Sequence, residues 1–192
     1  MSRTLVAILA GGLMLAGAAL AQGTAPTTHA GTKLSFPPTL GGAAFQQSYV
    51  LPAAGSGREP GYGWLYTTPN KLQVSFYVYE TGRRVPTSSD NPTVVSQFAN
   101  ELAAAEQSVK SSGMTGFERP AVPSACRYGT VSFRCIVFSA AAPGGGRLFS
   151  KLMVTGYHDY FVKIRVDWAQ ADGRTVGDAD QILQAIVPGL LR

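Results

Sequence analysis

The stretch NPTVVSQFANELAAAEQSVKSSG, residues 91–113, decides the fold class, because it predicts one long amphipathic helix. Asn91 is a natural N-cap, Pro92 suits the first helical position and Gly113 closes the far end. Apolar residues recur at three- and four-residue steps along it, namely Val95, Phe98, Leu102, Ala105 and Val109. A capped helix of this length excludes an all-β sandwich.

Alternating apolar and polar residues on both sides of this helix predict strands. Segments 62–66 and 71–80 form a predicted hairpin around Pro69-Asn70, and further strands are expected at 34–36, 45–51, 131–140, 148–157 and 160–168. Residues 178–191 carry a second amphipathic pattern, which Pro188 interrupts. The order of strands, helix, strands and helix predicts an α+β fold. We expect an antiparallel sheet of about five to seven strands, covered by a long helix at about 92–112 and a C-terminal helix at about 178–191.

The last two predicted strands also suggest a register. If their apolar residues share one buried face, a three-residue loop pairs Val154 with Ile164 and sets Lys151 opposite Asp167. A two-residue loop, 158–159, would instead put Val154 opposite Lys163 and mix the faces. The three-residue loop is therefore the prediction, with His158 at a solvent-facing tip.

The first 21 residues have the pattern of a cleaved export signal. Arg3 supplies the positive charge, residues 5–16 form a short apolar core, and Ala19-Leu20-Ala21 is a small-x-small cleavage site. The apolar stretch is shorter than the ~20 residues of a membrane span. We expect a mature chain that starts at Gln22 and is periplasmic or secreted, with a disordered leader at 22–33 and a single domain at 34–192.

Composition agrees with one exported globular domain. Charged residues make up 14% of the chain, below the ~25% of average proteins. The net charge of +5 is spread along the sequence, whereas nucleic-acid binding favours a clustered basic stripe. We therefore expect no nucleic-acid partner and no transmembrane span after signal cleavage.

Cys126 and Cys135 are the two cysteines of the chain. In an oxidising compartment two thiols most simply form one structural disulfide, and their spacing does not fit the two-residue gap of redox or zinc motifs. We predict a Cys126–Cys135 disulfide, with two separate buried thiols as the alternative.

Several short segments of the chain form a recognisable set: Phe36-Pro37, 40–42, 61–66, 78–82, Gln97-Phe98, 154–157 and 161–165. With these segments the chain resembles a group of exported proteobacterial proteins that has no assigned activity. The resemblance implies export and a shared fold. The element order is also similar to the PsbP-like fold of photosystem accessory proteins, an antiparallel sheet between helices.

Aromatic residues are the main candidates for ligand binding. Tyr62, Trp64 and Tyr66 share one face of a predicted strand, and Tyr77 and Tyr79 share the second face of its neighbour. Such a row stacks on sugar rings or holds an apolar ligand, and the alternative is that a helix covers it as core.

Two arginines extend this set of candidates. Arg83 and Arg84 follow the end of the second of these strands, where an anionic group can be received, with a solvated turn as the alternative.

Catalytic and metal-binding patterns are weak. His158-Asp159 is best interpreted as a turn pair, and G-x-S-x-G does not occur. The chain offers too few His and Cys ligands for zinc, and its acids suggest no glycosidase pair. We expect no metal and no cofactor.

The leading hypothesis is therefore a non-enzymatic periplasmic binding or accessory domain for an envelope component or small ligand. The alternatives are a hydrolase of cell-envelope carbohydrate and an envelope structural subunit.

Overall fold

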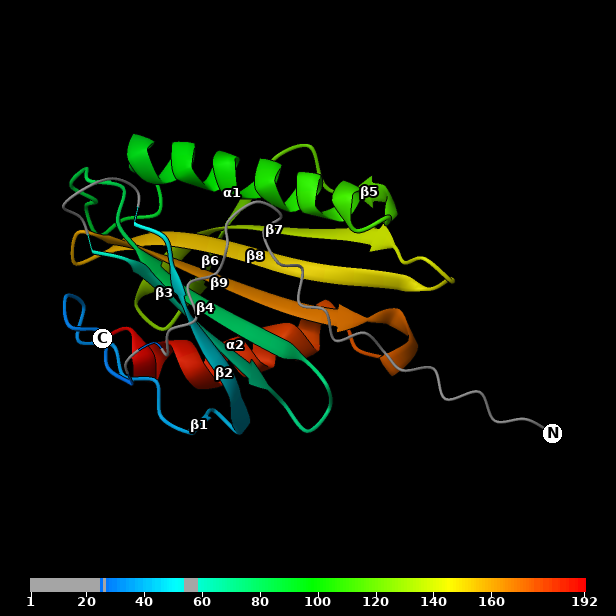
Figure 1. Cartoon of the computed structure of the whole chain (residues 1–192), viewed down its shortest axis with the longest axis horizontal. Coiled ribbons are helices and arrows are strands. Elements are labelled where there is room, and N and C mark those ends of the chain that lie inside the picture. The colour runs from blue at the N-terminus through cyan, green and yellow to red at the C-terminus, as the bar shows by residue number, and fades with distance from the viewer. Residues whose placement is uncertain (1–24, 26, 54–58) are drawn as a thin grey trace.

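The computed structural model describes residues 25, 27–53 and 59–192. These residues build a nine-stranded antiparallel sheet that lies between two helices, α1 above and α2 below it in Figure 1. The strands are β1 (Thr39–Leu40), β2 (Ala43–Leu51), β3 (Gly61–Thr67), β4 (Gln73–Tyr79), β5 (Thr115–Glu118), β6 (Ser124–Tyr128), β7 (Val131–Ala141), β8 (Arg147–Tyr157) and β9 (Tyr160–Ala169). Their order across the sheet is β1-β2-β3-β4-β9-β8-β7-β5. β6 also pairs with β7, along the first half of that strand, whereas β5 pairs with its end. The predicted α+β class is confirmed.

The strand count exceeds the expected five to seven because three short strands escape the alternation pattern: β1, β5 and β6. The strand expected at 34–36 is wrong, since Ser35 makes only an isolated bridge to Thr28. The prolines that follow this segment carry the chain on to β1 instead. The predicted hairpin of β3 and β4 is confirmed, with Trp64 opposite Phe76.

Helix α1 spans Pro92–Ser111 and begins as its sequence predicts. The side chain of Asn91 accepts a hydrogen bond from the Thr93 N–H at 2.9 Å, which satisfies one of the free donors of the first turn. The buried face differs by one residue from the expected stripe, because Val94 is buried and Val95 is 36% exposed. Val94 lies four residues before Phe98, and residues four apart lie on the same side of a helix. The buried face of α1 therefore begins at Val94.

Helix α2 spans Val176–Leu190 and starts at a capping box. The Thr175 hydroxyl accepts from the Asp178 N–H, while the Asp178 carboxylate accepts from the Thr175 N–H at 2.8 Å. Pro188 lies inside the last turn of the helix rather than ending it. The 3-10 turn η1, Gln170–Asp172, connects β9 to this helix.

Each face of the sheet has its own hydrophobic core. On the α1 side, Phe98 and Leu102 pack over Leu152, Val154 and their neighbours in β7 and β9. On the α2 side, the helix packs over the larger core, which continues across β3, β4, β8 and β9. Both faces of the central strands are therefore buried.

This double coverage explains why the predicted β8–β9 register is wrong. Tyr157 pairs with Tyr160 across the two-residue turn His158-Asp159, so Lys151 lies opposite Val166 and Asp167 lies opposite Ser150. Lys151 and Asp167 thus occupy opposite faces of the sheet. The apolar residues of the two strands do not need to share one face, because α1 covers one set and α2 covers the other.

Residues 27–33, part of the expected disordered leader at 22–33, are ordered in the structure. The proposed export signal lies outside the described residues, but residues 27–36 form a closed loop in which the Phe36 N–H donates to the Thr27 carbonyl at 2.7 Å. His29 is 1% exposed and meets Tyr62 and Tyr160 edge-on. This part of the chain belongs to the packed domain, because it supplies apolar and aromatic side chains to the α2-side core.

Candidate functional site

The aromatic candidates do not form one surface. The pairing of β3 with β4 sets Trp64 opposite Phe76 and Gly63 opposite Tyr77, so the two groups of rings point to different faces. Tyr62, Trp64 and Tyr66 lie on the α2 side, and Tyr77 and Tyr79 lie on the α1 side. A binding groove that combines both groups is therefore not formed.

The α2-side group belongs mainly to the core. Trp64 is 1% exposed and its ring stacks on that of Phe36 with centroids 3.7 Å apart. Tyr66 is fully buried, donates its hydroxyl to the Pro37 carbonyl at 2.8 Å, and has a pKa raised to about 12 by burial. Tyr62 is half-buried against His29. These rings hold the N-terminal loop against the sheet.

On the α1 side, Tyr79 takes part in a buried polar cluster around Glu101. The Glu101 carboxylate of α1 pairs with the Lys163 ammonium of β9 at 2.8 Å and accepts the Tyr79 hydroxyl at 2.5 Å. Gln97 donates its amide to the same carboxylate at 3.0 Å. Burial by itself would raise the pKa of Glu101, but attraction to Lys163 and the three hydrogen bonds outweigh it and lower the pKa. Glu101 is therefore an ionised anchor of α1 and not a general acid.

Tyr77 lies at the edge of this cluster. The Lys163 ammonium sits over its ring, 4.0 Å from the centroid, and the Tyr49 ring approaches it edge-on at 5.9 Å. Beside them, Arg165 donates to Asp167 at 2.8 Å and to the Ser150 hydroxyl at 2.9 Å. The crevice between this group and α1 holds about 30 Å³, room for about one water. These polar groups satisfy one another and leave little space for a ligand.

Arg83 and Arg84 are exposed beyond the end of β4. Arg84 pairs with Asp159 at 3.3 Å, with side chains 86% and 56% exposed, so the pair contributes little to stability. His158 is exposed in the β8–β9 turn, as predicted. The structure brings neither arginine to the predicted tyrosines.

The predicted disulfide is confirmed. Cys126 of β6 and Cys135 of β7 are bridged across the hairpin with Cα atoms 6.0 Å apart, within the usual range of ~4.4–6.8 Å. Cys126 pairs with Phe133 in the ladder and Cys135 pairs with Ser124, so the bridge is diagonal. It ties the short edge strand β6 to its ladder partner β7.

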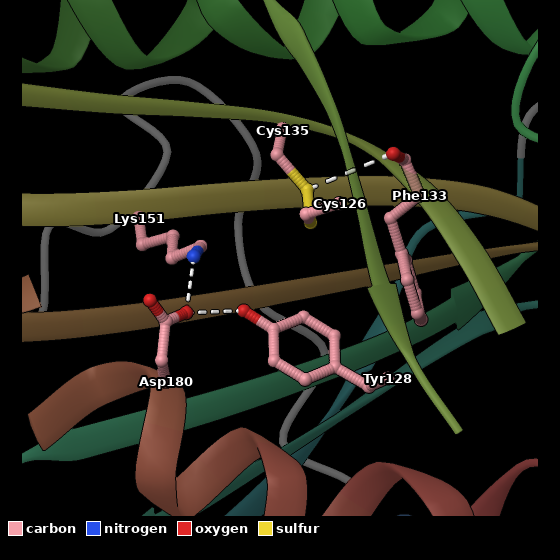
Figure 2. The surroundings of a disulfide bond; sticks show 6 residues. All are labelled: Cys126, Tyr128, Phe133, Cys135, Lys151 and Asp180. Carbon is pink, nitrogen blue, oxygen red and sulfur yellow. Dashed lines mark hydrogen bonds and ion pairs between the residues drawn. A yellow bond between two sulfur atoms is a disulfide. The ribbon is translucent and has the colours of Figure 1, made fainter. Parts of the chain in front are cut away.

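A pocket of about 470 Å³ lies beside this disulfide, between β6, β8 and the first half of α2. Its lining residues are Cys126, Arg127, Tyr128, Lys151, Asp180, Gln181 and Gln184. We call it the disulfide pocket. Figure 2 shows its central contact, in which the Asp180 carboxylate receives both the Lys151 ammonium and the Tyr128 hydroxyl.

The electrostatics of the disulfide pocket depend on Lys151, whose side chain is only 8% exposed although it carries a charge. Asp180, 45% exposed, compensates this charge from α2. Burial and the hydrogen bond to Asp180 raise the pKa of Tyr128, so its hydroxyl stays protonated and donates. The wall of the pocket thus combines an ammonium, a guanidinium, a carboxylate, a phenol and two amides.

A second pocket of about 480 Å³ lies on the other side of the same half of α2, against the β1–β2 and β3–β4 turns. It shares Gln181 with the disulfide pocket, and its wall includes Leu72, Pro69 and Ile182. It offers more apolar surface and fewer converging polar groups than the disulfide pocket.

The disulfide pocket was not predicted from the sequence, although one signal for it exists. Lys151 is the one charged residue between Leu148 and Tyr157 of β8, and Asp180 lies in the first turns of an amphipathic helix. These two residues are 29 positions apart and meet only because α2 crosses the face that Lys151 occupies.

Within the described residues, no group of three or more His, Cys, Asp or Glu side chains is placed to hold a metal ion. In the same part of the chain, neither helix has the length and hydropathy needed to cross a membrane. Comparisons with protein-family models, curated proteins and solved structures find no match to this chain.

Proposed function

We propose that this protein is an exported, non-enzymatic binding or accessory domain, and that its ligand occupies the disulfide pocket. The observation that carries the proposal is the convergence of the buried Lys151 and Tyr128 with the half-exposed Asp180 on an open hollow of about 470 Å³. Small-molecule sites usually enclose ~300–1,000 Å³ and contain a few well-placed polar groups. The disulfide and the signal-like first 21 residues support a location outside the cytoplasm.

The chemistry of the pocket favours a small polar ligand. Gln181 and Gln184 present amides that both donate and accept hydrogen bonds, and Lys151 adds donors. Asp180 is already engaged twice, so it serves to orient Lys151 and Tyr128. A ligand with hydroxyl or carboxylate groups, such as an envelope saccharide fragment, matches this set.

The hydrolase alternative is less well supported. Glycoside cleavage generally uses two carboxyl groups ~5–10 Å apart, one of them with a raised pKa. Asp180 is the one carboxylate among the described residues that line the disulfide pocket. Glu101, the buried carboxylate on the other side of the sheet, has a lowered pKa.

The binding proposal is tested by mapping chemical-shift changes in the mature protein, starting at Gln22, on addition of the low-molecular-weight fraction of an envelope extract. We expect changes at the residues of the disulfide pocket. Gln184→Trp should block them, because Gln184 is an exposed helical residue on the pocket wall. Gln107→Trp, an exposed glutamine on α1, is the matched control and should leave them unchanged.

Shifts outside the disulfide pocket, equal shifts in both variants, or no shifts would overturn the proposal. Export is tested separately by the intact mass of the protein recovered from cell fractions. Full-length protein that remains in the cytosol would contradict it.

A further inference from the structure

The two sulfur atoms of the disulfide lie in different environments. Cys135 is 2% exposed and belongs to the α2-side core. Cys126 is only partly buried and lines the disulfide pocket, whereas Cys135 is not among the lining residues. A reagent that reaches the pocket therefore meets Cys126 first.

The position of the strands gives the reason for this asymmetry. β6 forms the rim of the sheet, and within the described residues its ladder partner is β7. β7 has β6 on one side and β8 on the other, so Cys135 is enclosed between two strands. Opening a path to Cys135 requires displacement of β6 or of the core beneath it.

We propose that Cys126 is the thiol-exchange site of this protein, through which an external thiol opens and re-forms the disulfide. The external thiolate attacks Sγ of Cys126, a new sulfur–sulfur bond forms there, and the Cys126–Cys135 bond breaks. The bonding electron pair leaves on Sγ of Cys135, which takes up a proton from solvent. In the reverse direction the Cys135 thiolate attacks Sγ of Cys126 and expels the external thiolate.

Two features of the site suit this exchange. The pocket is an open hollow of about 470 Å³ beside Cys126, which leaves room for a cysteinyl side chain. Arg127 lines the same pocket next to Cys126, and a nearby positive charge favours thiolates. Thiol exchange at Cys126 uses the open space of the pocket and does not require a bound ligand.

Single-cysteine variants test the proposal. Cys135→Ser leaves Cys126, and Cys126→Ser leaves Cys135. We expect the Cys126 thiol to form a mixed disulfide with oxidised glutathione at least about tenfold faster than the Cys135 thiol, after each rate is normalised to that of the denatured variant. Equal rates, or faster reaction of Cys135, would overturn the proposal.

A second measurement uses the wild-type protein, so the test survives if either variant fails to fold. Reduced glutathione is added to the native protein, free thiols are trapped with an alkylating agent, and peptides are mapped by mass. Glutathione should be found on the Cys126 peptide and the alkyl group on the Cys135 peptide, and the opposite labelling would refute the proposal.

A further experiment tests whether the external thiol belongs to a protein or to a small molecule. It uses a dithiol oxidoreductase whose second active-site cysteine is replaced, so that the mixed disulfide with its target stays trapped. A trapped complex through Cys126 identifies a protein dithiol as a competent partner. Reaction with glutathione alone identifies a small thiol, and a complex through Cys135 would again overturn the assignment.

Discussion

The buried ion pair between Glu101 and Lys163 allows a sharp test of how α1 is attached to the sheet. Replacement of Glu101 by Gln keeps the shape of the side chain but removes its charge. Lys163 is then left as an ammonium that is only 9% exposed. Breaking a buried pair by removing one partner costs ~3–5 kcal/mol. Because the Tyr77 ring lies 4.0 Å from the ammonium and partly stabilises it, we expect about 3 kcal/mol for Glu101→Gln.

Urea unfolding measures this loss, and the same helix provides a matched control. Glu106 pairs with Lys110 at 2.9 Å, but these side chains are 36% and 62% exposed. Glu106→Gln should therefore change the free energy of unfolding by no more than about 0.5 kcal/mol. If Glu101→Gln costs no more than Glu106→Gln, the inference that this pair anchors α1 is wrong.

Two further measurements separate the charge from the packing. In the double variant Glu101→Leu/Lys163→Met, part of the lost stability should return, because no buried charge is left unpaired. Recovery should be incomplete, because the Tyr79 hydroxyl and the Gln97 amide lose the carboxylate that accepts their hydrogen bonds. The lowered pKa of Glu101 also sets a pH dependence. Its contribution is complete above the ordinary value of 4.5 and is lost as the pH falls through the lowered pKa, so the gap between wild type and Glu101→Gln should narrow in acid.

Three other predictions concern local geometry. Gly156→Ala should lower stability by ~1–3 kcal/mol, because its Cβ would lie 2.0 Å from the Pro86 carbonyl oxygen; an unchanged urea midpoint would contradict this. Burial lowers the pKa of His29, although the nearby Glu59 carboxylate acts in the opposite direction. The free energy of unfolding should therefore have its full value above about pH 6.5 and fall below that pH by at most ~1.4 kcal/mol per pH unit. A His29→Gln variant whose stability has the same pH profile as wild type would refute this. His158→Asn with Asp159→Gly should raise stability by ~1 kcal/mol, because both positions have positive φ (49° and 67°); a lower melting temperature in calorimetry would show this wrong.

Elements with strong local signals could be predicted from the sequence. The N-cap, the proline and the final glycine define α1, since capping depends on a few adjacent residues. The difference between Val95 and Val94 arises because the helix axis is set by what it packs on, here β7 and β8, and not by the helix sequence itself.

Elements whose formation depends on neighbouring strands could not be predicted from the sequence. β5 (TGFE) and β6 (SACRY) carry little apolar alternation, because most of their side chains remain exposed at the sheet edge. β6 is held by its ladder to β7, by the disulfide and by Tyr128, its one buried side chain. The packed loop at 27–36 is of the same kind, since the buried state of His29 depends on Tyr62 and Tyr160 from two distant strands.

The β8–β9 hairpin shows how one assumption governs both the register and the site. An alternating strand suggests one buried face and one wet face, and under that assumption Lys151 and Lys163 would both point to solvent. Two amphipathic helices in a chain with one sheet imply instead that both faces are covered, one by each helix. Each inward lysine then needs a carboxylate from the helix that covers its face of the sheet. α1 provides Glu101 for Lys163, and α2 provides Asp180 for Lys151. The charged residues of the strands therefore mark where each helix docks, and the docking of α2 at Lys151 creates one wall of the disulfide pocket.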